Sequence, residues 1–153
     1  MRDIDASELC RKIVEATPDA VIFADREGVM RLWNGGATAL FGYSADEAIG
    51  QSLDLIIPER LQGRHWEGYH RVMATGVTKY GRELLSVPAV RRDGERLSLE
   101  FSVALLRDDT GELLGIVAVL RDVTARFERD RELRRRLTAL EAELAQTRAS
   151  ADE

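Results

Sequence analysis

The clearest alternation of apolar and polar residues along the chain lies in residues 95–107. Every second residue there is apolar, and the apolar positions are Leu97, Leu99, Phe101, Val103 and Leu105. A period of two residues is typical of a strand with one buried and one polar face. The Asp93-Gly94 pair just before this strand is a strong hairpin signal. We therefore expect an antiparallel partner strand over residues 82–91.

Three further strands and four helices follow from the same kind of pattern. The apolar run 113–121 predicts another strand, and the runs 21–24 and 29–33 flank a turn and predict a hairpin. Capping residues and the Pro or Gly residues beyond the ends predict helices over 7–16, 34–41, 44–50 and 59–75. Strands and helices do not alternate, so the pattern predicts an α+β fold with an antiparallel sheet and helices gathered on one face.

The last thirty residues carry a second periodicity. Four leucines are spaced four, three and four residues apart, and they are Leu133, Leu137, Leu140 and Leu144. A repeat averaging 3.5 residues keeps one stripe facing a partner helix. We expect this stripe to be the seam of a short coiled coil, in a homodimer to which the N-terminal helix also contributes with Ile4, Leu9, Ile13 and Val14.

Composition narrows the class of protein. A chain of 153 residues with a net charge of −5 fits one domain plus an appendage, and its acidity argues against a nucleic-acid partner. The single cysteine, Cys10, excludes an internal disulfide and a Cys-based zinc site and favours a reducing compartment. No apolar stretch reaches the length of a membrane span, and the acidic start lacks the apolar core of a signal peptide, so we expect a cytoplasmic protein with no membrane partner.

The residues also lack a catalytic set. Nucleophilic catalysis needs a nucleophile and a base within hydrogen-bond reach, and acid–base catalysis needs positioned titratable groups. The two histidines, His65 and His70, occur on different faces of one predicted helix, and no phosphate-cradling glycine loop or nucleophile elbow is present. We therefore predict that the chain is not an enzyme.

Several short motifs occur in the order found in PAS domains, and the chain resembles that family over residues 10–124. The matching segments are Ile13–Val21, Trp33-Asn34, Leu40–Ser44, Glu47–Gly50, Ile57–Glu59, Arg92–Gly94 and Arg121–Thr124. The resemblance implies a five-stranded antiparallel sheet in the order 2-1-5-4-3, with helices enclosing a cavity on one face. It also implies a flanking helix over 1–17, a core over 18–122 and a signalling helix over 123–153.

In that family the domain serves as a sensor or a dimerisation module in signal transduction. The motif Asp122-x-Thr124 resembles the one that couples the sheet to the C-terminal helix, and we expect Asp122 to cap or tether the start of that helix. The implied partner is a histidine kinase or another output protein. That output comes either from a separate partner or from further parts of a longer chain, and the sequence leaves this open.

Helical geometry separates the two histidines. At 100° per residue, Leu61, Tyr69 and Val72 lie within about 40° of His65 around the predicted helix 59–75. His70 points about 140° away from His65. The count predicts that His65 faces the cavity, and it excludes a metal site built from both histidines.

An inward histidine on this helix resembles the proximal ligand of haem-binding PAS domains, such as the rhizobial oxygen-sensing kinases and the bacterial haem-regulated phosphodiesterases. This resemblance implies haem b held by His65 as its metal ligand, and sensing of a diatomic gas or of redox state. Those sensors carry an oxygen-stabilising arginine twenty positions beyond the histidine, where this chain has Leu85. An apolar residue there favours carbon monoxide or nitric oxide over oxygen. The other residues expected around the cofactor are Tyr69, Val72, Arg82, Leu99, Phe101 and Val117.

The sequence leaves three alternatives to haem open. The domain is a ligand-free interaction module if side chains fill its cavity, and the candidates are Leu53, Ile56, Ile57 and Leu84. A flavin could stack on Trp33 or Trp66, although the cysteine motif of the LOV photosensors is absent. A small organic ligand would need a polar anchor such as Tyr80, Arg82 or Ser86.

Overall fold

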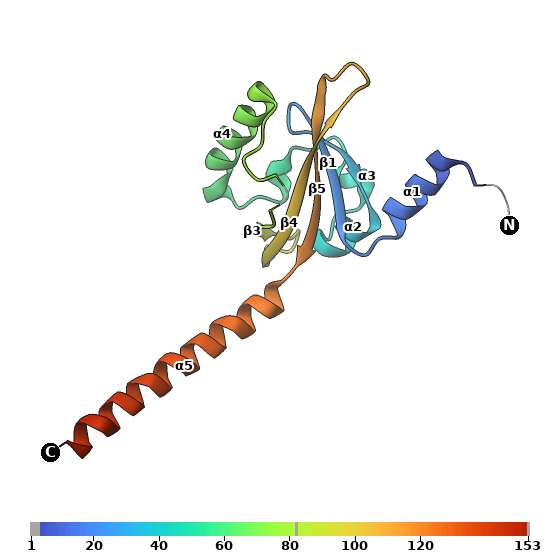
Figure 1. The fold of residues 1–153 in the computed structure, drawn as a ribbon. Helices are drawn as coiled ribbons and strands as arrows, with labels where there is room; N and C mark the ends of the chain where they lie inside the picture. Colours follow the sequence, from blue (N-terminus) through green and yellow to red (C-terminus); the bar gives the residue numbers. More distant parts are fainter. Residues whose placement is uncertain (1–3, 82, 153) are drawn as a thin grey trace. The chain divides into compact units, whose positions relative to one another are not determined.

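The computed structural model of the chain describes residues 4–81 and 83–152, so the prediction for Arg82 lies outside the described residues. Five antiparallel strands form one sheet in the order β2-β1-β5-β4-β3, which confirms the expected PAS topology (Figure 1). The strands are β1 (Ala20–Asp25), β2 (Met30–Trp33), β3 (Leu85–Val90), β4 (Arg96–Arg107) and β5 (Leu113–Asp122). The helices are α1 (Ala6–Ala16), α2 (Gly35–Phe41), α3 (Ala45–Ala48), the 3-10 turn η1 (Leu53–Leu55), α4 (Glu59–Thr75) and α5 (Thr124–Ala151).

Local sequence signals explain where the helices begin and end. Ser44 and Glu47 form the expected capping box of α3, each accepting a hydrogen bond from the other's backbone N–H. Gly42 and Gly76 follow α2 and α4 in the left-handed conformation, which glycine adopts without steric cost.

A buried asparagine joins the first elements of the chain. The Oδ1 atom of Asn34 accepts hydrogen bonds from the N–H groups of Val21 (2.8 Å) and Ala37 (2.9 Å). Its Nδ2 group donates to the carbonyl oxygens of Val14 (2.8 Å) and Asp19 (3.0 Å). Because this side chain is only 1% exposed, its hydrogen bonds replace those it would make with water. Asn34 thus fixes the end of α1 and the start of α2 against β1.

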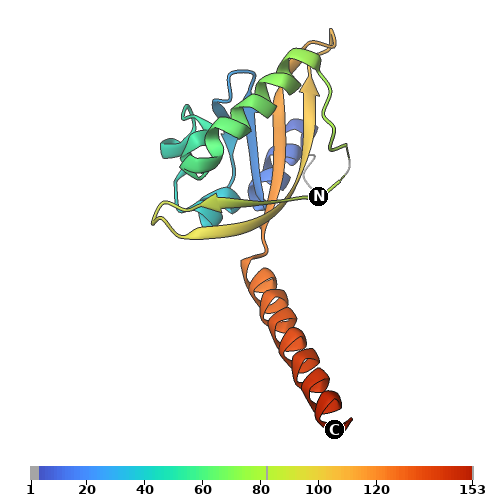
Figure 2. The same ribbon diagram turned by 90° about the vertical axis from the view of Figure 1, so that its left-hand side faces the viewer.

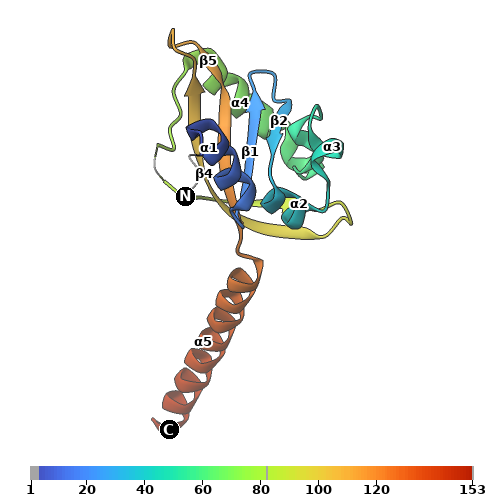
Figure 3. The same cartoon turned by 90° about the vertical axis from the view of Figure 1, so that its right-hand side faces the viewer.

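Helix α4 lies across one face of the sheet, and α1 lies on the opposite side (Figures 2 and 3). Among the described residues, the buried apolar side chains form two clusters. The larger one joins β1, β2, α2 and the β3–β4 hairpin and includes Ile22, Trp33, Phe41 and Leu99. The smaller one joins α4 to the ends of β1 and β5 through Tyr69, Met73, Ala24 and Leu113.

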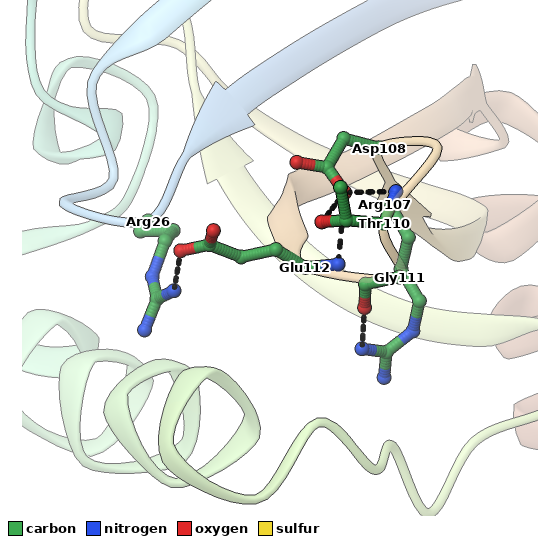
Figure 4. Close-up of polar contacts among 6 residues, drawn as sticks. All are labelled: Arg26, Arg107, Asp108, Thr110, Gly111 and Glu112. Atoms are coloured by element: carbon green, nitrogen blue, oxygen red, sulfur yellow. Dashed lines mark hydrogen bonds and ion pairs between the residues drawn. The ribbon is translucent and has the colours of Figure 1, made fainter.

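The turn between β4 and β5 is tied to its neighbours by side-chain hydrogen bonds (Figure 4). The Oδ1 atom of Asp108 accepts from the backbone N–H groups of Thr110 (2.8 Å) and Glu112 (3.0 Å). Arg107 donates from Nη1 to the carbonyl of Gly111 (3.0 Å). Its Nη2 donates to the carbonyl of Gly76 (2.8 Å), which lies outside the view of Figure 4. The last bond fastens the C-terminal end of α4 to the hairpin.

The chain divides into two compact units, Met1–Asp122 and Val123–Glu153. The second unit is α5, a helix of 28 residues that buries none of its side chains. Its N-cap is Val123, without a side-chain capping bond, and Asp122 is the last residue of β5. Val123 rather than Asp122 therefore occupies the N-cap position, and a role of Asp122 in tethering the start of α5 stays a prediction. No helix in the described parts of the chain is long and apolar enough to cross a membrane.

Candidate functional site

A cavity of about 230 Å³ lies between α4 and the sheet. Helix α4 contributes Leu61, His65 and Tyr69, which are four residues apart and therefore share one face of the helix. The remaining wall comes from all strands except β2 and from the segment around η1. Those residues are Ile22, Ala24, Leu53, Ile56, Ile57, Val87, Pro88, Ala89, Leu99, Phe101, Val103, Ile116, Ala118 and Leu120.

Strand register explains why the sheet presents apolar groups to the cavity. Residues directly opposite each other in paired strands project from the same face of the sheet. Ala118 of β5 pairs with Ile22 of β1 and with Val103 of β4. Phe101 of β4 in turn pairs with Leu120 of β5. The alternation of β4 thus continues across its neighbours, and one face of the sheet becomes a continuous apolar wall.

The imidazole of His65 is one of two polar side chains in this wall. Its Nδ1 atom is buried and has no hydrogen-bond partner among the described residues. Burial lowers the pKa of His65 below its usual 6.5, an effect that Asp54 opposes and the neighbouring His70 reinforces. The imidazole is therefore neutral at pH 7, the form in which histidine can hydrogen-bond as donor and acceptor or ligate a metal.

Tyr69 is the other polar residue of the wall, and its hydroxyl group is already bonded. It donates to the carbonyl oxygen of Asp25 at 2.5 Å, and the carbonyl oxygen of Ala24 is 3.3 Å away. Burial raises the pKa of Tyr69 far above its usual value, and the charges of Asp25 and Glu27 act in the same direction. Tyr69 is thus a neutral tether between α4 and β1.

Trp66 holds α4 at a second point. Its indole Nε1 donates to the carboxylate of Asp54 in η1 at 2.7 Å. The six-membered ring lies against Gly28 in the β1–β2 turn, where a Cβ atom would overlap it. His70 stacks on Trp66, with ring centroids 5.7 Å apart, and its side chain is exposed. His70 is absent from the cavity wall, in agreement with the opposite directions expected for the two histidines.

The structure brings four of the eight residues expected around a cofactor to the cavity: His65, Tyr69, Leu99 and Phe101. Val72 packs in the smaller buried cluster instead. Leu85 begins β3, opposite Phe101, and is not part of the wall. Val117 alternates with Ile116 and Ala118, so it lies on the other face of the sheet, and its expected position is corrected.

Of the residues considered for a filled cavity or for other ligands, some lie in the cavity wall and others lie elsewhere. Leu53, Ile56 and Ile57 line the cavity without filling it, whereas Leu84 is 64% exposed. Trp33 lies in the larger core cluster, where its Nε1 donates to Thr38 and to the carbonyl of Tyr43. In the described parts of the chain, no group of three His, Cys, Asp or Glu residues could hold a metal ion.

Comparison with known proteins identifies the family. The model of the PAS fold matches residues 14–128. The chain belongs to the PAS family. It is 31% identical over 137 residues to the sensor protein FixL of Bradyrhizobium diazoefficiens, covering 88% of this chain and 25% of FixL. It is 30% identical over 129 residues to the cell-division control histidine kinase PdhS of Brucella ovis, covering 82% of this chain and 12% of PdhS.

Solved structures show the same fold. The PAS domain of a protein from Colwellia psychrerythraea superposes with a TM-score of 0.69 at 21% identity, over 79% of this chain and 99% of that domain. The chain spans a quarter or less of the length of the two curated relatives described above. This chain is thus a PAS domain related to a segment of a longer sensor protein and to a segment of a longer histidine kinase.

Proposed function

We propose that this PAS domain is the input module of a signalling protein and that the cavity under α4 reads the signal. The proposal rests on the cavity itself, an apolar space next to a neutral, unsatisfied imidazole. Its output is a histidine kinase or a similar protein, as in the relatives named sensor protein and histidine kinase. The module itself carries out no catalysis and acts in the cytoplasm.

A blocked cavity tests this role. Ala118→Phe puts a ring into the cavity from β5, and Val119→Phe puts the same ring on the other face of that strand, where Val119 is 40% exposed. For the assay, α5 is joined in helical register to a histidine-kinase domain. We expect the autophosphorylation rate of the Ala118→Phe variant to be the same with and without a cell extract. Val119→Phe should keep the wild-type response to a cell extract. Equal behaviour of the two variants would show that the cavity is not the input site.

Haem is a second candidate for the ligand of the module, because the donor chemistry fits. A neutral histidine in an apolar wall is the kind of axial ligand that haem iron takes, and bound haem supplies a site for a diatomic gas or an electron. The cavity is too small for haem in the present structure. Its volume lies below the roughly 300–1,000 Å³ that is usual for ligand sites, so a porphyrin enters only if α4 and the sheet separate.

An absorbance titration decides whether haem binds. If His65 is the ligand, adding haem to the purified chain gives a Soret band at one haem per chain, and His65→Ala shifts or abolishes that band. His70→Ala serves as the matched control, since the His70 side chain is exposed and lies outside the cavity wall. No saturable Soret band, or one that both variants leave unchanged, rules out haem ligation by His65.

We also propose that the chain forms a homodimer through α5, with a contribution from α1. Most of the stability of helices in proteins comes from packing of an apolar face, and α5 buries none of its residues within the chain. The leucines of its predicted seam, Leu133, Leu137, Leu140 and Leu144, are 57–61% exposed. Leu9 and Ile13 of α1, and Ile4 just before this helix, are 46–59% exposed. A second copy of the chain would cover both stripes.

Sedimentation measures this association. Leu137→Asp puts a charge into the seam, whereas Ala142→Asp puts the same charge five residues later, on the opposite side of the heptad. We expect the first variant to weaken dimerisation strongly and the second to leave it nearly unchanged, with the circular dichroism of the sheet retained in both. Undiminished dimerisation of a chain ending at Thr124 would show that α1 or another surface is the main contact.

A further inference from the structure

The side chains of the cavity wall limit the charge of the ligand that the cavity can bind. Seventeen described residues line the space, and fifteen of them are apolar. None of these described lining residues is a Lys, Arg, Asp or Glu that could neutralise an ion. Moving an unpaired ion from water into such a space is very unfavourable. A ligand that fits this wall is therefore neutral and mostly apolar.

The two polar side chains of the wall differ in what they still offer a ligand. The Tyr69 hydroxyl already donates its hydrogen to the carbonyl oxygen of Asp25. The buried Nδ1 atom of His65 makes no hydrogen bond with any described residue, and the ring contacts of the imidazole are with the aromatic rings of Trp66 and Tyr69. Buried polar atoms in proteins are nearly always hydrogen-bonded, so this nitrogen indicates a missing partner at His65.

The volume limits the size of that partner. A dry engineered protein cavity of about 150 Å³ lined by Leu, Ile and Phe binds benzene, which has six non-hydrogen atoms. In proportion, a cavity of about 230 Å³ accommodates about nine. That is the size of a substituted benzene or a bicyclic aromatic ring, and it is far smaller than a porphyrin or a flavin.

We infer that the cavity binds a small neutral molecule of about nine non-hydrogen atoms, with an aromatic or branched apolar body and one polar group that hydrogen-bonds to His65. The inference rests on the proposed role of the cavity as the input site and adds the chemical class of its ligand. The apolar body fills the space between Ala118, Phe101 and Leu61. The polar group supplies the partner that the imidazole lacks.

Two probes that differ by one hydroxyl group test the inference on the full chain. 4-Methylphenol carries the polar group, and toluene has the same apolar body without it. Binding is followed by chemical-shift changes in ¹H–¹⁵N spectra. We expect His65→Phe to weaken binding of 4-methylphenol about tenfold, as loss of one hydrogen bond predicts, and to change binding of toluene less than twofold. His70→Phe should leave both affinities unchanged.

Blocking variants identify where the probes bind. Ala118→Phe should abolish binding of both probes, and Val103→Phe provides a second block from β4 if the first variant does not fold. The inference is overturned if neither probe binds, if a folded blocking variant still binds them, or if His65→Phe weakens both probes equally. A stoichiometric haem complex held by His65 overturns it as well. The two proposals can fail separately. If the probes bind as expected but Ala118→Phe leaves the autophosphorylation response of the kinase fusion unchanged, the input role is refuted and the inferred class of ligand still holds.

Discussion

Gly28 in the β1–β2 turn is a position where adding a single methyl group should destabilise the fold. Its φ angle is +78°, in the left-handed region that side chains rarely adopt. A Cβ atom at this position would overlap the six-membered ring of Trp66. That ring cannot swing away freely, because its Nε1 is held by Asp54 at 2.7 Å. Gly28→Ala therefore combines backbone strain with a steric clash against α4.

The two contributions can be estimated and separated. The left-handed conformation costs a residue with a Cβ atom about 1–2 kcal/mol, and an overpacked contact typically costs about 1–3 kcal/mol. The sum for Gly28→Ala is about 2–5 kcal/mol. Gly94 has a similar φ of +85° and has no atom within 4 Å of the position of a Cβ. Gly94→Ala therefore measures the backbone cost alone.

Urea unfolding followed by circular dichroism gives both values. We expect Gly28→Ala to lose more free energy of unfolding than Gly94→Ala, and the difference is the cost of displacing Trp66. Fluorescence of the chain should change in Gly28→Ala because the indole ring moves. Equal losses in the two variants, with unchanged fluorescence, would refute the close packing of α4 on this turn.

Three further predictions follow from single residues. Asn34→Ala removes a buried side chain that satisfies four backbone groups, so it should cost more than about 3 kcal/mol in the same urea assay. Gly63→Ala should stabilise the chain by about 0.5–1 kcal/mol, since Gly63 lies within α4 at a negative φ and a Cβ there meets nothing within 4 Å. The lowered pKa of His65 makes the free energy of unfolding depend on pH. Below about pH 6.5, the histidine binds a proton in the unfolded chain but not in the folded chain. The free energy of unfolding therefore falls as the pH drops from about 6.5 toward the lowered pKa. Unfolding measured from pH 7.5 to 5 should show this fall in the wild type and in His70→Phe, and a smaller fall in His65→Phe.

Local sequence signals were sufficient for most of the fold. The alternation in β4 and the Asp93-Gly94 turn predicted the hairpin, and the antiparallel pairing of β3 with β4 confirms it. Capping residues located the starts of α2 and α3 in the same way. These signals work because each depends on residues that are close together in the chain. The boundaries of β3 were less certain, and the strand is shorter than the predicted 82–91.

The cavity wall was harder to predict because it depends on which face of each element is buried. On α4, the count of 100° per residue placed His65 and Tyr69 correctly in the wall. Val72 lies on the same stripe, but it is about 10 Å farther along the helix axis than His65, beyond the end of the cavity. In β5 the run from Ile116 to Leu120 is apolar throughout, so its sequence carries no alternation from which the face of Val117 could be predicted.

The start of α5 shows a different limit. A carboxylate directly before a helix is a common N-cap, and Asp122 fitted that rule. In the structure β5 continues through Asp122, and Val123 occupies the cap position. The end of a strand is set by the length of its partner as well as by its own residues. Asp122 is paired with Leu99 of β4, and this pairing keeps it in the sheet.

Two aromatic side chains of α4 hold this helix against the rest of the domain. Trp66 bonds to η1 and Tyr69 bonds to the carbonyl oxygen of Asp25, and both flank His65 on the helix. A ligand that fits within about 230 Å³ can bind while both hydrogen bonds remain. A larger one must displace α4 and break them, at about 1 kcal/mol of net stability each. Breaking both hydrogen bonds weakens the binding of the larger ligand by a factor of about 30. This cost selects against large ligands that bind weakly, but a large ligand that binds tightly can still enter. Trp66 and Tyr69 are therefore expected to set the size limit of the cavity, while His65 selects the polar group of the ligand.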